Sequence, residues 1–336
     1  MLLCVSALAG GAGAAWATRP TPATASGQFP RPMPDAIDVL SGRPEPAPTL
    51  DPQPDVDAPI PEPPTGTFAT NLRDGMVVTG ATERRMILFT FDDGPDPRNT
   101  PRLLDVLDEY GIRAVFFLTT HRLAGHSPWQ ETNREIAREI VRRGHLVGNH
   151  TAEHAQLPLL GNEEVLAQVE RADATLEEVL GSRAYLMRPP GGARSDRVDR
   201  LLASRGYTQV LWNLGTGDFQ VRDSEAVLRT FTRVLDRRAR ENGERGGIVL
   251  LHDTHEWSVD AVPRIVGWLR DQNCALLEQE EELYDIVGEP RWFFAPRGDD
   301  ASAEAPAAEP PPEVFAERQR RLREQTRRRC DRVASR

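Results

Sequence analysis

The chain has 336 residues and a formal net charge of −10, a length that accommodates one large domain or two ordinary ones. The acidic balance argues against general nucleic-acid binding, which requires a basic surface, so no nucleic-acid partner is expected. The basic residues are all arginine, which indicates a bias of composition rather than a mechanism.

The first 17 residues form an apolar run of small side chains that ends in an Ala-x-Ala pattern. The run predicts a secretory signal peptide cleaved after Ala17, or the remnant of a membrane anchor, although the usual positively charged start is missing. We therefore expect export to the periplasm, the cell envelope or the medium. Residues 18–66 are rich in proline and predict an extended linker. This linker either tethers a domain to a membrane or cell wall or is a spacer without further function.

Short apolar runs alternate with amphipathic segments from about Asp74 onward, and we expect one catalytic domain over residues 80–290. The expected strands are Met86–Phe91, Ala114–Thr119, His145–Asn149, Tyr185–Arg188, Gln209–Leu214, Ile248–Leu251 and Ala275–Leu277. The expected helices are Pro101–Tyr110, Glu131–Arg143, Glu163–Leu180, Ser195–Arg205, Ser224–Arg240 and Val259–Arg270. Regular strand–helix alternation implies a parallel sheet, open or closed, and about seven units favour a barrel.

The pattern fails beyond Pro290, and residues 299–336 predict a disordered or charged tail. Within it, Val314–Val333 is expected to be a mostly charged helix, either solvated or in contact with an anionic surface through its arginines. Cys274 and Cys330 lie far apart in different segments, so we expect no disulfide and interpret Cys274 as a small core residue.

The stretch from Leu88 to Asp96 is where the expected chemistry begins. A buried apolar strand ends at two adjacent carboxylates, Asp92 and Asp93, and Gly94-Pro95 then forces a turn. Because successive strand side chains point to opposite faces, the two aspartates can serve different tasks. The alternative is an ordinary acidic turn after a core strand.

Two histidines four residues apart, His150 and His154, follow the third expected strand. On one helical face this spacing lets both imidazoles reach one divalent metal, although either histidine can instead be structural. Asp93 ends the first strand on the same rim. Two histidines and one carboxylate leave positions open for water and substrate, which is typical of a catalytic metal site.

Two further strand ends carry polar residues, Arg188 after the fourth strand and His252 after the expected sixth. A single arginine or histidine at such a place is commonplace. Their coincidence with the aspartates and histidines at one edge predicts an active site, because βα folds gather their chemistry at the carboxyl ends of strands.

The chain thereby resembles the polysaccharide deacetylases of carbohydrate esterase family 4, the NodB homology domain, over about Arg84 to Val287. The segments that carry the resemblance are Thr90-Phe-Asp-Asp-Gly-Pro95, His150-Thr-Ala-Glu-His154, Arg188-Pro-Pro and Leu251-His252. It implies a distorted (β/α) barrel of fewer than eight strands. It further implies that Asp93 and the two histidines hold a divalent metal, commonly Zn²⁺. Asp92 would be the base, Arg188 its partner and His252 the acid.

Two motifs depart from the family pattern. Gly191 stands where the third motif usually carries an aromatic residue, although the backbone N–H credited with oxyanion binding survives. The fourth motif usually reads Asp-x-x-Asp-Trp and here reads Gly215-Thr-Gly-Asp218-Phe219. The missing first Asp normally supports the acid histidine. Unless Asp218 or Asp253 substitutes, we therefore expect the pKa of His252 to be lower than in enzymes that keep it.

Three aromatic residues, Trp212, Phe219 and Trp257, follow strand ends and can stack on sugar faces, with core packing as the alternative. The resulting hypothesis is a metal-dependent deacetylase of an N-acetylated polysaccharide, either a cell-wall glycan or an exopolysaccharide. The alternatives are an amidase or deformylase acting on another small substrate, and a glycan-binding module with an impaired site.

Overall fold

This computed structural model describes residues 77–288, 290–294, 304–305 and 310–334. The expected signal segment 1–17, the linker 18–66 and most of residues 299–311 lie outside these ranges. Within the described ranges, no helix is both long and apolar enough to span a membrane.

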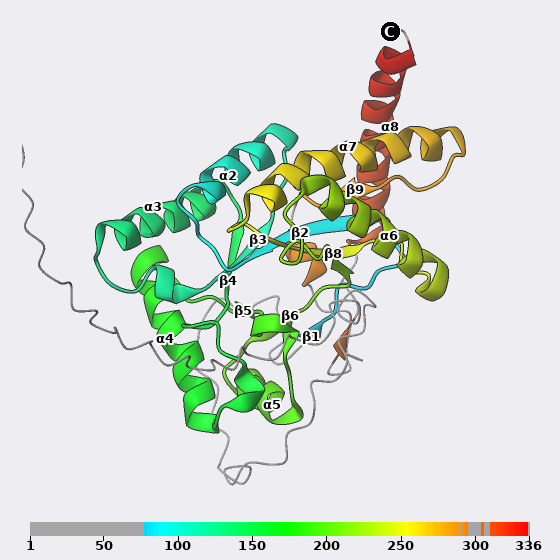
Figure 1. Cartoon of the computed structure of the whole chain (residues 1–336). Coiled ribbons are helices and arrows are strands. Elements are labelled where there is room, and N and C mark those ends of the chain that lie inside the picture. Colours follow the sequence, from blue (N-terminus) through cyan, green and yellow to red (C-terminus); the bar gives the residue numbers. More distant parts are fainter. Residues whose placement is uncertain (1–76, 289, 295–303, 306–309, 335–336) are drawn as a thin grey trace, which may run out of the picture. The chain divides into compact units, whose positions relative to one another are not determined.

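A parallel sheet forms the centre of the molecule (Figure 1). Its strands are β1 (Val77–Val78), β2 (Met86–Asp92), β3 (Val115–Leu118), β4 (Leu146–Asn149), β5 (Leu186–Met187), β6 (Thr208–Val210), β7 (Leu214–Gly215), β8 (Gly247–His252), β9 (Asp285–Ile286) and β10 (Glu304–Ala305). The order is β10-β1-β6-β5-β4-β3-β2-β8-β7, and β9 pairs with β2. No pairing joins β10 to β7 among the described residues, so the sheet is an incompletely closed barrel. The predicted distorted (β/α) barrel is confirmed.

Helices connect most successive strands, since adjacent parallel strands need a crossover connection, whereas β1–β2 and β6–β7 are joined without an α-helix. The helices are α2 (Asn99–Tyr110), α3 (Pro128–Arg142), α4 (Asn162–Leu180), α5 (Asp196–Ser204), α6 (Ser224–Asn242), α7 (Glu256–Glu278) and α8 (Pro312–Ala334). Short 3₁₀ turns lie at Thr120–Arg122, Leu157–Leu159, Pro190–Gly192 and Pro290–Phe293. Local sequence sets several boundaries: Ser127 caps α3 in a capping box with Gln130, and the Asp223 side chain accepts from two backbone N–H groups that begin α6.

Two predicted strands differ from the structure. The segment Ala275–Leu277 is the end of α7 rather than a strand, because Ala and Leu favour helix and the apolar spacing of the preceding turns continues through it. The predicted strand Gln209–Leu214 is divided between β6 and β7. Asn213, in the break, donates to the carbonyl oxygen of Gly246 and accepts from the backbone N–H of Ile248.

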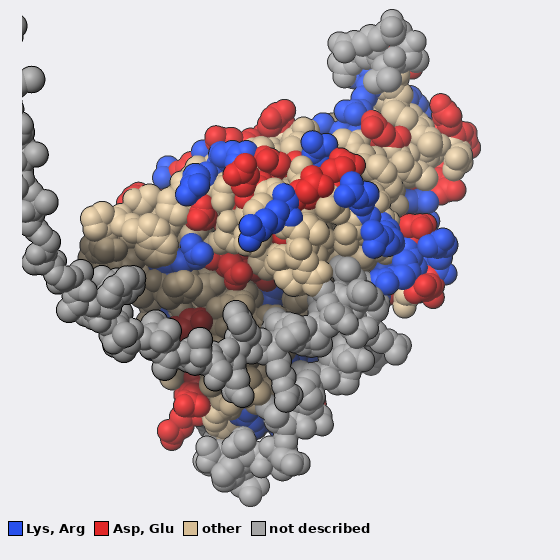
Figure 2. Space-filling view, viewed as in Figure 1, with Lys and Arg blue, Asp and Glu red and all other residues tan. Residues whose placement is uncertain are grey.

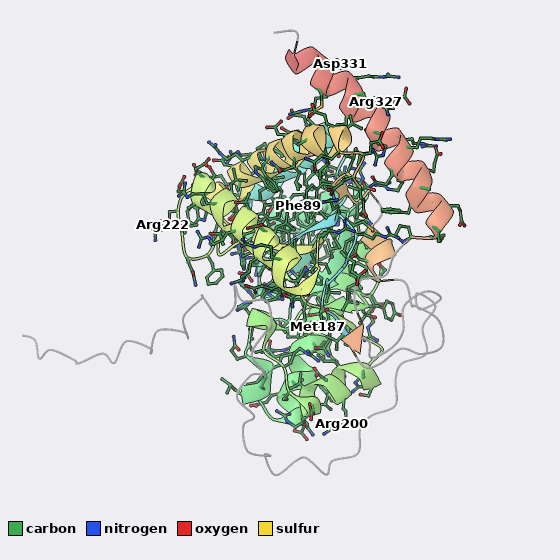
Figure 3. All side chains as sticks on the ribbon, turned by 90° about the vertical axis from the view of Figure 1, so that its right-hand side faces the viewer. Phe89, Met187, Arg200, Arg222, Arg327 and Asp331 are labelled. Atoms are coloured by element: carbon green, nitrogen blue, oxygen red, sulfur yellow. A yellow bond between two sulfur atoms is a disulfide. The ribbon has the colours of Figure 1, made fainter. Side chains whose placement is uncertain are left out.

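The two faces of β2 belong to different cores, as strand alternation dictates. Ile87, Phe89 and Phe91 pack outward against the helices, and Met86 and Leu88 pack inward with residues of the neighbouring strands. Figure 3 labels Phe89 deep among these side chains. Continuing the alternation places Asp92 on the inner face, at the carboxyl end of the strand.

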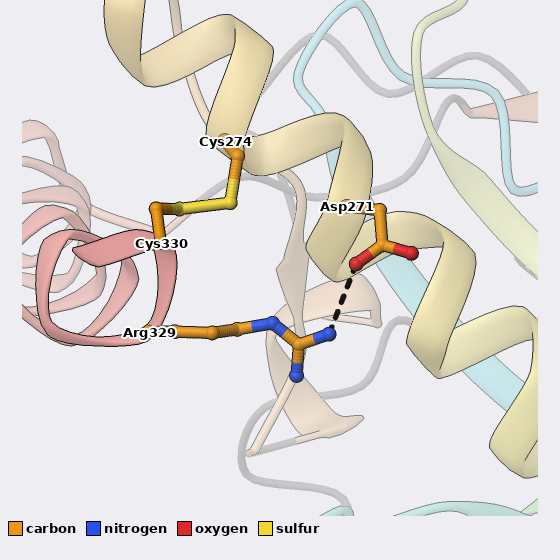
Figure 4. Close-up of a disulfide and its surroundings, with 4 residues drawn as sticks. All are labelled: Asp271, Cys274, Arg329 and Cys330. Carbon is orange, nitrogen blue, oxygen red and sulfur yellow. Dashed lines mark hydrogen bonds and ion pairs between the residues drawn. A yellow bond between two sulfur atoms is a disulfide. The ribbon is translucent and has the colours of Figure 1, made fainter. Parts of the chain in front are cut away.

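The C-terminal helix α8 is covalently bonded to α7 (Figure 4). Cys274 and Cys330 form a disulfide with a Cα–Cα distance of 6.0 Å, so the prediction that they form none is wrong. Next to the disulfide, Arg329 of α8 pairs with Asp271 of α7 at 3.0 Å, and Asp271 lies one helical turn before Cys274. The sequence could not reveal the disulfide because the two cysteines are separated by 56 residues and their pairing depends on how α8 docks.

The surface over α2 and α7 shows arginines and carboxylates interspersed rather than segregated by sign (Figure 2). One such pair joins these two helices, with Arg102 Nη2 lying 2.7 Å from Asp260 Oδ1. Both side chains are about half exposed, so the pair contributes little to the free energy of folding.

Candidate active site

The carboxyl ends of the central strands bring together the polar residues singled out in the sequence. Asp92 ends β2 and His252 ends β8, and the two residues are direct partners in the register of these adjacent strands. His150 directly follows β4, and Arg188 directly follows β5. Parallel pairing therefore places all four at one edge of the sheet.

The turn after β2 has an unusual backbone. Asp93 adopts a left-handed conformation with φ of 74°, and the Gly94–Pro95 peptide bond is cis. A Cβ on Gly94 would lie 2.2 Å from Asp253 Oδ2, so only glycine permits this close approach. The same Oδ2 accepts a hydrogen bond from Thr100 Oγ1 at 2.5 Å, and burial raises the pKa of Asp253 to about 7. These contacts fix the turn that carries Asp93.

Asp93, His150 and His154 form a cluster of three potential metal ligands, whose ligand atoms all lie within 4.8 Å of one another. Asp93 Oδ1 lies 3.5 Å from His150 Nε2 and 3.4 Å from His154 Nε2. This oxygen is buried and has no hydrogen-bond partner among the described residues. Two imidazole nitrogens and a carboxylate oxygen suit a divalent transition metal such as zinc, so the donor set fits the metal that the family resemblance implies.

The predicted helical face for the two histidines is wrong, because residues 150–156 form no helix. Thr151 and His154 both have positive φ, of 69° and 56°. This irregular backbone brings the imidazole rings to a centroid distance of 5.0 Å. The spacing indicated proximity correctly, but a loop rather than a helical turn produces it.

His150 is held in one orientation by its Nδ1 atom, which lies 2.7 Å from the carbonyl oxygen of Arg188. A carbonyl can only accept, so Nδ1 carries the proton and Nε2 presents a lone pair toward Asp93. Burial lowers the pKa of His150 to about 3, which keeps the ring neutral. The loop itself is anchored by Asn149, whose side chain accepts from the N–H of Thr151 and donates to buried Asp173.

Asp92 and Arg188 form a buried ion pair, with Arg188 Nη1 lying 2.7 Å from Asp92 Oδ1. Burial raises the pKa of Asp92, and the charge and hydrogen bond of Arg188 oppose that rise without cancelling it. The other oxygen, Oδ2, lies 3.7 Å from His150 Nε2. Asp92 therefore faces the metal-ligand cluster with one oxygen and the arginine with the other.

Arg188 is wholly enclosed. It donates to the hydroxyl of Thr90, and to the carbonyl oxygens of Val210 and Leu211 at 2.8 and 3.2 Å. Its guanidinium lies 4.2 Å from the ring centroid of Phe117 and 5.4 Å from that of Trp212. Trp212 is thus half-buried beside this arginine rather than free at the rim.

The half-buried His252 and the buried Asp218 form the second pair. His252 Nδ1 lies 2.9 Å from Asp218 Oδ1, and Asp218 Oδ2 accepts from the His252 backbone N–H and from Ser258 Oγ. Burial acts to lower the pKa of His252, but the charge and hydrogen bond of Asp218, with smaller contributions from Asp92 and Asp93, outweigh it and raise that pKa to about 9. Asp218 therefore substitutes for the carboxylate missing at Gly215, which is the exception that the sequence left open, and the lower pKa expected without such a substitute does not apply.

The remaining predicted residues surround this pair and the loop of His154. Gly191 has φ of 63° within the turn Pro190–Gly192, and a Cβ on it would lie 3.2 Å from the side-chain nitrogen of Gln156. Phe219 is 46% exposed, with its ring 5.9 Å from that of His252. Trp257 is half-buried and donates through Nε1 to the carbonyl oxygen of Asp218 at 2.6 Å.

Two residues with a place in the site, Thr90 and Gln156, escaped prediction, and a third was predicted only conditionally. Asp218 was named only as a possible substitute, Thr90 bonds Arg188, and Gln156 approaches Gly191. Strand alternation could have indicated Thr90, which lies two residues before Asp92 and hence on the same face. No comparable signal locates Gln156, because it lies on an irregular loop.

Comparison with known proteins agrees with this geometry. Residues 79–210 match the family described as polysaccharide deacetylase. The chain is 29% identical over 204 residues to a peptidoglycan-N-acetylglucosamine deacetylase of Bacillus cereus, covering 59% of this chain and 88% of that protein. It is 30% identical over 202 residues to the peptidoglycan-N-acetylmuramic acid deacetylase PdaC of Bacillus subtilis, covering 60% of this chain and only 39% of that one.

Among solved structures, the chitin deacetylase of Colletotrichum lindemuthianum superposes with a TM-score of 0.52 at 26% sequence identity. The superposition covers 59% of this chain and 87% of that one. The family match includes the turn with Asp92 and Asp93, the loop with His150 and His154, and Arg188. Over residues 79–210 this chain is therefore similar to the polysaccharide deacetylase family.

Proposed function

We propose that this protein is a metal-dependent hydrolase that removes N-acetyl groups from an N-acetylated glycan outside the cytoplasm. The observation that carries the proposal is the placement of three metal-ligand atoms within 4.8 Å of one another beside two separate proton-transfer groups, Asp92 and His252. The names of the relatives, which are peptidoglycan and chitin deacetylases, support the choice of substrate class.

Asp93, His150 and His154 would hold the divalent metal, most simply Zn²⁺. When bound, such an ion polarises the amide carbonyl and lowers the pKa of a bound water. The neutral state of His150 and the exposed position of His154 suit this role, since one ligand is fixed inside and the other faces the substrate side. The family resemblance and the donor set both favour zinc without fixing the metal used in the cell.

Asp92 would act as the general base that accepts a proton from the attacking water. Its carboxylate is buried, and its pKa is raised by that burial, which brings a weak base closer to the working pH. Arg188 would orient the carboxylate through the 2.7 Å contact to Oδ1, leaving Oδ2 on the side of the metal ligands.

His252 would protonate the departing nitrogen. A pKa of about 9 keeps its imidazole charged at neutral pH, and its Nε2 lies 3.9 Å from Asp93 Oδ2, on the side of the metal ligands. Water then adds to the acetamide carbonyl carbon, the carbon–nitrogen bond breaks, and acetate and a free amine leave. The backbone N–H of Gly191 would stabilise the negative oxygen formed during this addition.

The disulfide supports the expected export, because such bonds persist in oxidising compartments. Phe219 and Trp257 remain candidates for the groove that binds the sugar. Trp212 has the weaker claim, because it packs beside the enclosed Arg188. Tethering through residues 18–66 stays a prediction.

The test is acetate release from a panel containing soluble N-acetylglucosamine oligomers, peptidoglycan fragments, simple acetamides and N-formyl amines. We expect release from at least one glycan, abolished by a chelator and restored by zinc. Turnover confined to the simple amides would favour a different hydrolase. Stoichiometric zinc binding without turnover on any substrate would favour a glycan-binding module.

A further inference from the structure

Large apolar side chains are strongly exposed at four places among the described residues. They are Trp129 (45%), Val141 (45%), Leu159 (65%) and Phe219 (46%). Single exposed apolar residues need no explanation, but three of these share one location. Trp129, Leu159 and Phe219 lie in segments that follow the carboxyl ends of β3, β4 and β7, whereas Val141 lies at the far end of α3. The exposed apolar surface is therefore concentrated on the edge that carries the candidate active site.

Trp129 is the most firmly positioned of the three. It lies in the first turn of α3, behind the capping box of Ser127 and Gln130. The side chain of Arg134 in the next turn donates to the carbonyl oxygen of Leu123 at 2.8 Å. The start of α3 is thereby held on the turn that follows β3.

This turn is itself joined to the loop of the metal ligands. The backbone N–H groups of Thr120 and His121 donate to the carbonyl oxygens of Thr151 and Ala152 at 3.1 and 2.8 Å. These two acceptors lie between His150 and His154 in the sequence. Trp129 is therefore connected to the candidate metal site through one intervening turn, the turn that follows β3.

Arg122 links Trp129 to the turn after β2. Its guanidinium lies 5.8 Å from the indole centroid, and Nη1 donates to the carbonyl oxygen of Pro95 at 3.3 Å. Pro95 is two residues from Asp93. The arginine thus lies over one face of the indole while the side chain stays 45% exposed, which suits a stacking ligand on its other face.

We propose that Trp129 is a stacking platform for a sugar unit beyond the one that reacts, so that the site takes an N-acetylated glycan chain rather than a single sugar. The aliphatic C–H face of a pyranose ring packs well against an aromatic face, and burying both surfaces from water favours the contact. This inference rests on the proposed function, since it extends the same site along the β3 side. Phe219 lies on the opposite side of the site, beside His252 at the end of β8.

The test compares Trp129→Ala, Trp129→Phe and the matched control Val141→Ala, which lies on the same helix and is equally exposed. Acetate release gives kcat/KM for N-acetylglucosamine oligomers from dimer to hexamer. We expect Trp129→Ala to lower kcat/KM about three- to tenfold on the hexamer, mainly through KM, with the smallest loss on the dimer. Trp129→Phe should recover most of the loss, and Val141→Ala should behave as the wild type.

A binding measurement separates this inference from the proposed function. Calorimetric titration of the hexamer into Asp92→Asn, with and without Trp129→Ala, requires no turnover. Weaker hexamer binding in the variant that also carries Trp129→Ala supports the platform, even if the wild type releases no acetate. The absence of acetate release would defeat only the proposed function. Equal binding with and without the indole, or an equal loss of kcat/KM on dimer and hexamer, overturns the inference.

Discussion

The strand-end site and the contact between α7 and α8 both join residues that are distant in the sequence, but they do so by different means. At the site, each functional residue ends or follows a parallel strand, so the regular sheet determines the edge at which it lies. At the α7–α8 contact, a disulfide and side-chain pairs fix a helix that no sheet register positions. A regular framework makes distant neighbours predictable, and a docked terminal helix does not.

The two regions also differ in how they treat charge. In the site, Asp92, Arg188 and Asp218 are almost completely buried, and each has a close partner of opposite charge or a protonated imidazole. Along α8, pairs such as Glu324 with Arg328 are largely exposed and screened by solvent. Removing one partner should therefore be costly at the site and nearly neutral on α8.

The largest effect is expected from the metal-ligand cluster. Changing Asp93, His150 or His154 to Ala should remove the bound metal and lower kcat/KM by at least roughly 10³-fold, because each change removes a ligand and leaves too few donors. Metal content by mass spectrometry and acetate release should be measured on the same samples. His126→Ala is the matched control, because that imidazole is exposed and forms its ion pair with Glu131, away from the three ligands. Full metal occupancy in any of the three variants would remove that residue from the site.

Asp92→Asn should separate metal binding from proton transfer. The variant should retain the metal and lose about 10²- to 10⁴-fold in kcat, because only the base is altered. Asp105→Asn, at an exposed carboxylate paired with Arg143, controls for the loss of one negative charge. Loss of metal in Asp92→Asn would show that the roles of the two adjacent aspartates are exchanged.

Asp218→Asn should shift the alkaline limb of the pH profile. In the wild type His252 works while protonated, so activity should fall as pH rises through about 9. Removing the Asp218 charge lowers the pKa of His252, so the alkaline limb should move to lower pH. Activity below neutral pH should fall less than activity above it. The same linkage means that the His252 interaction stabilises the fold below pH 6.5 and is lost as pH rises through about 9. An unmoved limb in a folded, metal-loaded variant would mean that His252 is not the acid.

The smallest effect on catalysis is expected from Cys330→Ser. The free energy of unfolding should fall by about 2–4 kcal/mol, because the unfolded chain loses a constraint, while kcat/KM should stay within about twofold. Denaturant unfolding of the variant, and of the wild type with and without reductant, measures the first quantity. A folded variant with much lower kcat/KM would break the distinction between the two regions, since α8 would then act on the site.

Particular residues show how far sequence reasoning reaches. Asp92 and Asp93 were located because a buried strand and a Gly-Pro turn bracket them, and the parallel sheet was predicted from the repeated βα pattern. The loop geometry of His154 could not be predicted, because positive φ at a non-glycine residue depends on surrounding contacts. The pairing of Asp218 with His252 depends on the path of a turn after β7. The proposed role of Trp129 depends on the exposure of its side chain. Periodicity encodes neither property.

The most direct test of the central claim is stoichiometric reconstitution of the purified protein. Metal-free protein should release no acetate from an N-acetylated glycan, and zinc should restore release in proportion to occupancy up to one ion per chain. Asp92→Asn titrated in parallel should bind the same single ion and remain inactive. Acetate release by protein shown to be metal-free, or restoration that requires more than one ion per chain, would contradict the account.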